Sequence, residues 1–168
     1  EVAEIKTINI VGNKTFIDED ISKGFELKTG GWLSFFTNDN RYSREKLKGD
    51  IESIESFYKN QGFVEFKLES SQVSISPDKS SVYITLNISE GETYEVGDIK
   101  IVGDLPVDEE ILKSLVLIRS GETFNQFLIT ETEEIFKNIL GNEGYSFAEV
   151  RGVPDINKEK GSVDLTFY

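Results

Sequence analysis

The 168-residue chain carries 18 Lys and Arg against 31 Asp and Glu, which gives a formal net charge of −13. This excess of negative charge repels phosphate backbones and anionic lipid surfaces, so we expect no nucleic-acid partner. The sequence contains no Cys and no His, which excludes disulfides, thiolate nucleophiles, imidazole bases and the usual zinc ligands. No apolar run approaches the roughly 20 residues that a helix needs to span a bilayer. Because neither Met nor an apolar leader precedes Glu1, we expect a fragment or the mature portion of a longer protein.

The sequence contains an internal repeat. Residues 8–13, INIVGN, recur as IKIVGD at residues 99–104, so that Gly12 and Gly103 correspond. Further matches keep the same order along the chain, which is the signature of a duplicated module with loop insertions. These later matches set Gly62-Phe63 against Gly144-Tyr145, and Val82, Ile84 and Leu86 against Val163, Leu165 and Phe167.

The first repeat, residues 1–91, opens with a predicted strand followed by two predicted helices. Ile8 and Ile10 alternate with polar residues, which is typical of a half-buried strand. A short helix is predicted over residues 18–25, and a second one begins near Ser43, a residue type that favours helix N-caps. The apolar positions of this second helix recur at helical spacing and predict its buried face: Leu47, Ile51, Ile54 and Tyr58.

A predicted antiparallel hairpin completes the first repeat. Its strands, over residues 64–76 and 82–88, flank a Pro-Asp turn. Along the first of these strands the apolar positions change parity between Leu68 and Val73, which strict alternation cannot produce. An extra residue within 69–72 therefore predicts a β-bulge, a feature that is frequent on sheet edges.

We interpret this bulged strand as a sheet edge with two possible roles. The bulge either only protects the edge against aggregation, or the edge accepts an extended partner segment by β-augmentation. The candidate docking residues are Val64, Phe66, Leu68, Glu69, Gln72, Val73 and Ile75.

The second repeat, residues 92–168, shows the same order of elements. A strand is predicted over residues 99–102 and a helix over residues 108–115. The closing strands are predicted over residues 148–153 and 163–167, on either side of a turn at Pro154 to Asn157. The second helix of this repeat carries Leu128, Thr132, Ile135, Phe136 and Ile139. The fold class is therefore α+β, with two tandem β-α-α-β-β modules.

An insertion between the two helices of the first repeat contains the single Trp of the chain. Its aromatic residues, Trp32, Phe35 and Phe36, either pack beneath the helices as a satellite core or form an exposed patch for a partner.

Two acidic clusters, residues 18–20 and 108–110, could suggest a catalytic acid–base pair or calcium ligands. Each opens a predicted helix, where the helix macrodipole favours negative charge. Counted from Asp18, the sixth position is Lys23 rather than the Gly of a calcium loop. Gly12 also lacks the adjacent Lys of a phosphate-binding loop. We therefore predict no catalytic residue, no metal and no cofactor.

The ordered combination of these features resembles the polypeptide-transport-associated (POTRA) domain family. The features are the opening at residues 8–13, the helix exit at residues 60–63, the turn at residues 74–78, the strand exit at residues 88–91, and the repetition of the module. The first repeat resembles the third, and the second the fourth, of the five periplasmic POTRA domains of an outer-membrane assembly factor. The resemblance implies a three-stranded mixed sheet in each module, with the third strand central and two helices on one face.

The resemblance also implies a function. It indicates a non-enzymatic periplasmic portion of a bacterial outer-membrane protein, which would scaffold an accessory lipoprotein and meet unfolded outer-membrane proteins. The bulged strand of the first repeat resembles the lipoprotein-docking edge. The alternatives are POTRA modules of a related secretion or autotransporter-assembly transporter, a passive spacer, and a hydrolase with two converging carboxylates.

Overall fold

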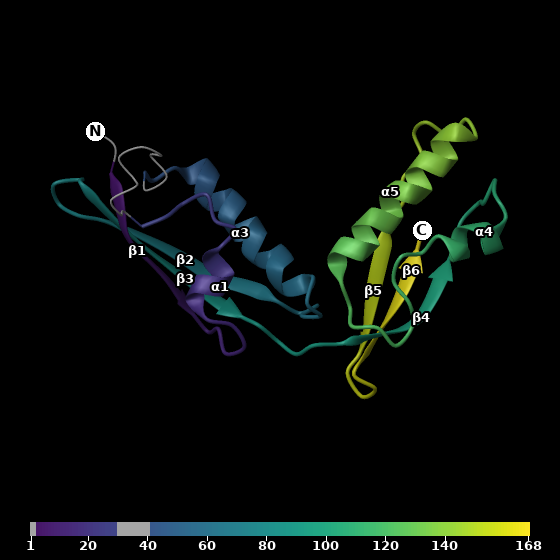
Figure 1. Cartoon of the computed structure of the whole chain (residues 1–168), viewed down its shortest axis with the longest axis horizontal. Coiled ribbons are helices and arrows are strands. Elements are labelled where there is room, and N and C mark those ends of the chain that lie inside the picture. The colour runs from purple at the N-terminus through teal and green to yellow at the C-terminus, as the bar shows by residue number, and fades with distance from the viewer. Residues whose placement is uncertain (1–2, 30–40) are drawn as a thin grey trace. The chain divides into compact units, whose positions relative to one another are not determined.

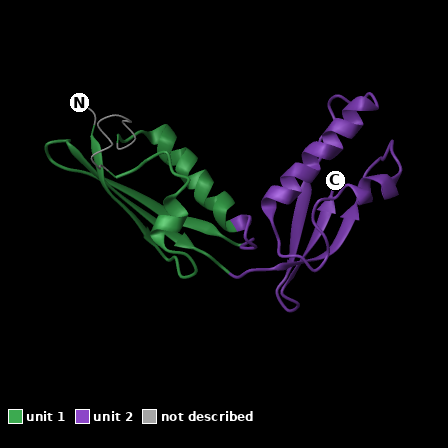
Figure 2. Ribbon diagram, in the orientation of Figure 1, with its two compact units in different colours: residues 1–58, 65–91 green, residues 59–64, 92–168 purple. Residues whose placement is uncertain are grey.

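The computed structural model describes residues 3–29 and 41–168 and forms two compact units (Figures 1 and 2). The first unit comprises residues 1–58 and 65–91, and the second comprises residues 59–64 and 92–168. The aromatic insertion with Trp32, Phe35 and Phe36 lies outside the described residues, so its role stays a prediction.

The sheet of the first unit has the strand order β1-β3-β2. Strand β1 runs parallel to β3, and β2 runs antiparallel to it, so the sheet is mixed and its last strand is central. This confirms the topology that the resemblance implied. The elements are β1 (Glu4–Val11), α1 (Asp18–Ser22), α3 (Arg44–Lys59), β2 (Lys67–Ile75) and β3 (Ser81–Ser89).

The described helices of the first unit, α1 and α3, cover one face of the sheet (Figure 1). Alternate residues of β3 are almost fully buried on that face because the central strand has a neighbour on each side and helices above it. The N–H of Lys46 donates to the Ser43 hydroxyl at 3.4 Å, as expected of an N-cap. The core residues of this unit include Ile5, Ile10, Ile21, Ile54, Tyr58, Val82, Ile84, Leu86 and Ile88.

The second unit repeats this architecture with the strand order β4-β6-β5. Strand β4 is parallel to the central β6, and β5 is antiparallel to it. Its buried residues form one core that includes Leu112, Ile129, Phe136 and Phe167. The elements are β4 (Glu95–Ile101), α4 (Glu109–Ser114), α5 (Gln126–Asn142), β5 (Gly152–Asn157) and β6 (Ser162–Phe167).

The predicted hairpin of the second unit was wrong in its boundaries. The predicted turn at Pro154 to Asn157 belongs to β5, and the turn follows it at residues 158–161. There the Asn157 side chain accepts the N–H of Lys160 at 3.1 Å, and Gly161 takes a positive φ of 63°. Proline is tolerated in an edge strand because its nitrogen can face away from the sheet.

A buried polar side chain recurs at the same helical position in both units. In α3, Asp50 accepts the backbone N–H groups of Glu26 and Leu27 at 2.7 and 2.9 Å. In α5, the Thr132 hydroxyl accepts the N–H of Leu117 at 3.1 Å. Burial raises the pKa of the Asp50 carboxyl, although these two backbone hydrogen bonds act to lower it. The two side chains thus satisfy equivalent loop amides, and they establish that Thr132 corresponds to Asp50.

The turn after β1 explains why Gly12 resembles a phosphate-loop glycine only superficially. Gly12 has a φ of 101°, and a Cβ at this position would meet the backbone carbonyl of Ile88. Glycine is therefore required for the turn and for close packing against β3.

Among the described residues, no helix is both long enough and apolar enough to cross a membrane.

Candidate docking edge

Strand β2 is an edge strand with a bulge, as the parity change predicted. Leu68 pairs with Ile88 and Ser70 pairs with Asn87, which leaves Glu69 as the extra residue between two consecutive pairs.

The hairpin turn that follows is held by side chains around Asp78. Hydrogen bonds from Ser76 and Ser80 lower the pKa of the Asp78 carboxyl to about 2.

The strand is shorter than predicted at its start. It begins at Lys67, so Val64 and Phe66 precede it. Phe66 is only 6% exposed, and its ring stacks on Tyr58 with centroids 4.5 Å apart. The prediction that Phe66 belongs to the docking edge was therefore wrong. Its place in the alternating pattern is typical of a strand residue, but its ring packs in an aromatic cluster with Tyr58 of α3. The apolar side chains that the edge itself offers are therefore Leu68, Val73 and Ile75.

Val73 and Ile75 are apolar, yet they are exposed by 37% and 55%. They pair with Ile84 and Val82, which are buried, so all four lie on the same face of the sheet. Apart from Leu68, which is half-buried, every residue of β2 is exposed. The free side of β2 thus combines an accessible backbone with two apolar side chains.

The direction of the backbone groups of β2 follows from the hairpin. The N–H of Ser76 donates to the carbonyl of Ser81 at 2.9 Å, so this pair is bonded across the hairpin. Because bonded and non-bonded pairs alternate along an antiparallel ladder, Ser71, Val73 and Ile75 direct their N–H and C=O groups away from β3. Within the described part of the chain, no further group bonds to these outward backbone groups.

The edge at β1 is covered by other parts of the first unit. The N–H of Tyr42 donates to the carbonyl of Ala3 at 3.2 Å, and Arg41 forms an antiparallel bridge with Glu4. Near the other end of β1, the N–H of Ile10 donates to the Asp18 carboxylate at 3.4 Å. This occupation leaves β1 less able than β2 to pair with an added strand.

The edge at β4 is covered in a similar way. The N–H of Val96 donates to the backbone carbonyl of Glu122 at 2.7 Å, and the carbonyl of Val96 accepts the N–H of Gly121 at 2.8 Å. Glu95 forms an antiparallel bridge with Thr123 next to these bonds. The segment before α5 therefore occupies the start of this edge.

The buried carboxylates of Glu90 and Asp50 each have their own hydrogen-bond donors. The Glu90 carboxylate accepts the Tyr58 hydroxyl at 2.7 Å and the backbone N–H of Thr15 at 3.2 Å, whereas Asp50 has its own loop donors. Burial by itself would raise the pKa of Glu90, but the hydrogen bonds from Tyr58 and Thr15 hold it below its usual value. Burial and the neighbouring Glu90 raise the pKa of Tyr58 strongly. This arrangement is a structural hydrogen-bond network.

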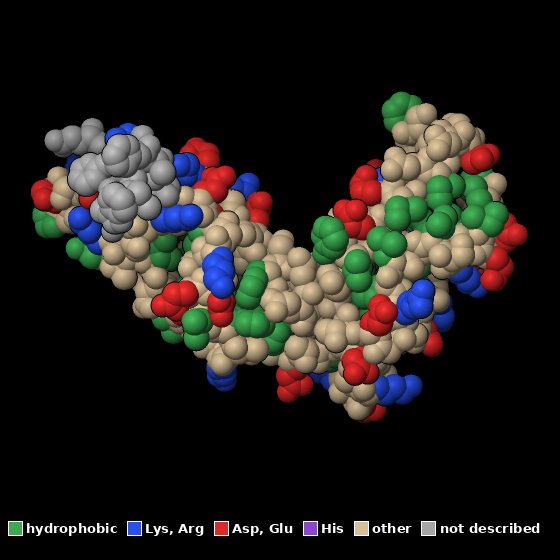
Figure 3. Space-filling view, viewed as in Figure 1, with side chains coloured by type: hydrophobic (Ala, Val, Ile, Leu, Met, Phe, Trp, Pro, Cys, Tyr) green, Lys and Arg blue, Asp and Glu red, His purple; other side chains and the backbone are tan. Residues whose placement is uncertain are grey.

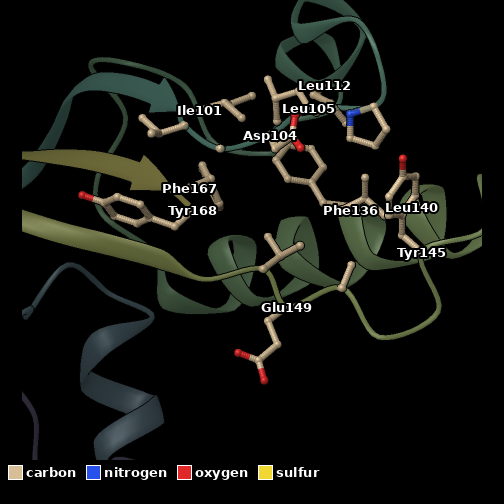
Figure 4. Close-up of a pocket in the computed structure, with 15 residues that line it drawn as sticks. Ile101, Asp104, Leu105, Leu112, Phe136, Leu140, Tyr145, Glu149, Phe167 and Tyr168 are labelled. Atoms are coloured by element: carbon tan, nitrogen blue, oxygen red, sulfur yellow. The ribbon is translucent and has the colours of Figure 1, made fainter.

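An apolar hollow of about 230 Å³ lies at one end of the second unit (Figure 4). Asp104 lines it, while the Glu149 side chain points away from it. The hollow therefore lacks the two converging carboxylates that a hydrolase requires. The apolar lining includes Ile101, Leu105, Leu112, Phe136, Leu140 and Phe167.

Acidic and basic side chains are interspersed over the visible face of the molecule (Figure 3). Within residues 3–29 and 41–168, no group of acidic side chains could hold a metal ion.

The fold defines a class of protein: tandem α+β modules, each built around a three-stranded mixed sheet. The family described as "POTRA: Surface antigen variable number repeat" matches residues 3–91 and again residues 94–168. The chain therefore belongs to the POTRA family.

Several curated relatives are described as "Outer membrane protein assembly factor BamA". The relative from Neisseria meningitidis serogroup B is 26% identical over 99% of this chain and 21% of its own length. The relative from Neorickettsia risticii is 29% identical over 98% of this chain and 22% of its own length. The relative from Buchnera aphidicola is 27% identical over 98% of this chain and 27% of its own length. The chain thus spans between a fifth and about a quarter of the length of these relatives.

Solved structures share the fold. The crystal structure of Haemophilus influenzae BamA POTRA3-5 aligns with a TM-score of 0.83 at 23% identity, over 99% of this chain and 65% of that one. The structure of Haemophilus ducreyi BamA lacking POTRA domains 1-3 aligns with a TM-score of 0.73 at 14% identity, over 98% of this chain and 28% of that one. Both alignments support the assignment of two POTRA-type modules.

Proposed function

We propose that this chain is a non-enzymatic periplasmic scaffold of the outer-membrane protein assembly machinery, and that β2 is its docking edge. The observation that carries the proposal is the row of outward backbone groups at Ser71, Val73 and Ile75. An extended segment of a partner pairs with such a row, while Val73 and Ile75 offer apolar contacts. The names of the curated relatives support the cellular context of the proposal.

The proposed partner at β2 is an accessory lipoprotein of the BamB type. The resemblance to the third POTRA domain supports this choice, and the open edge supports the mode of binding. Leu68, Glu69, Gln72, Val73 and Ile75 would carry the contact. Other subunits of the assembly complex, and unfolded outer-membrane proteins with extended strands, are the further partners that we propose for these modules.

The test is a titration of the nitrogen-15-labelled chain, followed by backbone amide shifts. One arm uses a purified BamB-type lipoprotein, and the other uses a synthetic peptide of about ten residues that alternates Val and Thr, a strand-forming composition. We expect shifts concentrated on residues 67–75 with the lipoprotein, and weaker shifts at the same amides with the peptide. Unchanged β2 amides in both arms would make the chain a spacer and refute the docking role.

A further inference from the structure

Strand β5 occupies in the second unit the place that β2 occupies in the first. Arg151 and Tyr168 exchange two backbone hydrogen bonds, of 3.1 and 3.0 Å, so they form a bonded pair next to the strand. The alternation of an antiparallel ladder then directs the backbone groups of Gly152, Pro154 and Ile156 away from β6. These three positions are the potential docking row of β5.

The first of these positions is occupied by a side chain from α5. The Gly152 N–H donates to the Glu133 carboxylate at 2.6 Å, and both residues are half-buried. A Cβ on Gly152 would lie 2.6 Å from the Ile129 side chain and 3.0 Å from the Phe167 ring. Glycine therefore lets α5 approach the strand closely, and the carboxylate takes the place that a carbonyl of an added strand would take.

The second position has no donor at all. Pro154 lacks an N–H, and its nitrogen faces the free side of β5. Together with the occupied Gly152 amide, this leaves Ile156 as the single outward N–H in the row.

The corresponding residues of the first unit have neither feature. Gly152 and Pro154 pair with Phe167 and Leu165, just as Ser71 and Val73 pair with the corresponding residues of β3. Because Thr132 corresponds to Asp50, the next residue, Glu133, corresponds to Ile51, which cannot accept a hydrogen bond.

We propose that Glu133 and Pro154 close the β5 edge against strand addition, so that a partner strand is directed to β2 alone. The identity of the excluded partner rests on the function proposed above. The occupation of the edge by Glu133 is independent of that function and has its own test.

The first experiment measures hydrogen exchange at the Gly152 amide. We expect exchange to be slow in the unmodified protein and at least about tenfold faster in Glu133→Ile, which removes the acceptor. Glu133→Gln is the matched control, because its amide oxygen still accepts at the same place and should keep the protection. Equal Gly152 exchange rates in Glu133→Ile and the unmodified protein would overturn the closure by Glu133.

The second experiment opens β5 with the double variant Glu133→Ile and Pro154→Val, which installs the residues of the first unit. It is made in a chain that also carries Val73→Pro, which removes one outward N–H and so weakens pairing at β2. We expect the alternating Val and Thr peptide to shift amides at residues 152–157 in this variant, and not in the chain with Val73→Pro alone. Self-association of the double variant through residues 152–157 would support the proposal equally.

The two proposals fail in distinguishable ways. If the peptide binds β2 of the unmodified chain but never binds the opened β5, the closure proposal is wrong. If neither the lipoprotein nor the peptide shifts the β2 amides of the unmodified chain, the docking function fails, and the Gly152 exchange rates still decide the role of Glu133. Dispersed amide spectra of each variant confirm that its sheets remain folded.

Discussion

Strands β2 and β5 hold equivalent places in two copies of one module, yet their free sides differ. β2 presents outward backbone groups at Ser71, Val73 and Ile75, whereas β5 has one amide bonded to Glu133 and one donor removed by Pro154. In our proposal the POTRA fold supplies an edge, and a few side chains decide whether that edge is available to a partner.

The largest effect is expected from Gly152→Val, which tests the close approach of α5 to β5. The new side chain would collide with Ile129 and Phe167, and we expect the second unit to lose about 3 kcal/mol of unfolding free energy. Ser71→Val, at the corresponding place in β2, should change the stability by less than about 0.5 kcal/mol because Ser71 is exposed. Urea unfolding of both variants measures the difference. Equal losses would show that the two edges are packed alike.

The next effect concerns the hydrogen bond between Tyr58 and Glu90 in the first unit. Tyr58→Phe leaves the buried Glu90 carboxylate without its shortest hydrogen bond, and we expect a loss of about 2 kcal/mol. The same helical position of the second unit is Leu140, which makes no such bond. Tyr83→Phe, which alters an exposed Tyr, is the control and should leave the unfolding free energy unchanged. A stability of Tyr58→Phe equal to that of the control would contradict the importance of this bond.

Val73→Pro gives β2 a proline at the position where β5 has Pro154. The proline removes an outward N–H and leaves the bonds to β3 intact, so the fold should persist. We expect binding of the lipoprotein to weaken at least about tenfold, or about 1.4 kcal/mol, in calorimetric titration. Val73→Thr keeps the N–H and the β-branched shape and should bind almost as the unmodified chain does. Undiminished binding by Val73→Pro would move the docking site away from this edge.

The smallest effect is a pH dependence confined to the first unit. The folded-state pKa of Glu90 is lowered, so its stabilisation is present above the unfolded-state pKa and is lost as the pH falls through the folded-state value. The raised pKa of Asp50 acts in the opposite direction, since protonation in the folded state is favoured there. We expect unfolding free energy to fall less steeply on acidification in Glu90→Gln than in the unmodified chain, measured by urea unfolding from about pH 6 to about pH 3. An identical slope for both proteins would exclude Glu90 as a contributor.

Local patterns predicted much of the candidate site. The parity change between Leu68 and Val73 located the bulge, which the register places at Glu69. Such a prediction succeeds because side-chain alternation in a strand depends only on neighbouring residues. The repeat boundary between residues 91 and 92 and the aromatic patch at Trp32 stay predictions.

Other features of the two edges have no local signature. The pattern of Phe66 matches a strand residue, but its ring is buried on Tyr58. The Pro-Asp dipeptide at Pro154 is typical of a turn, but it lies within β5 because the proline nitrogen faces outward. Alignment of Thr132 with Asp50 could have marked Glu133 as the counterpart of Ile51, although no sequence signal connects Glu133 with Gly152.

The sequence by itself determined the duplication, the order of strands and helices in each module, the bulge, and the absence of thiol and imidazole chemistry. These properties follow from residue types and short-range periodicity. Only the tertiary structure decided which edge is open. The contacts that close β5 join residues on different elements, such as Glu133 and Gly152, and these meet only after α5 has packed on the sheet.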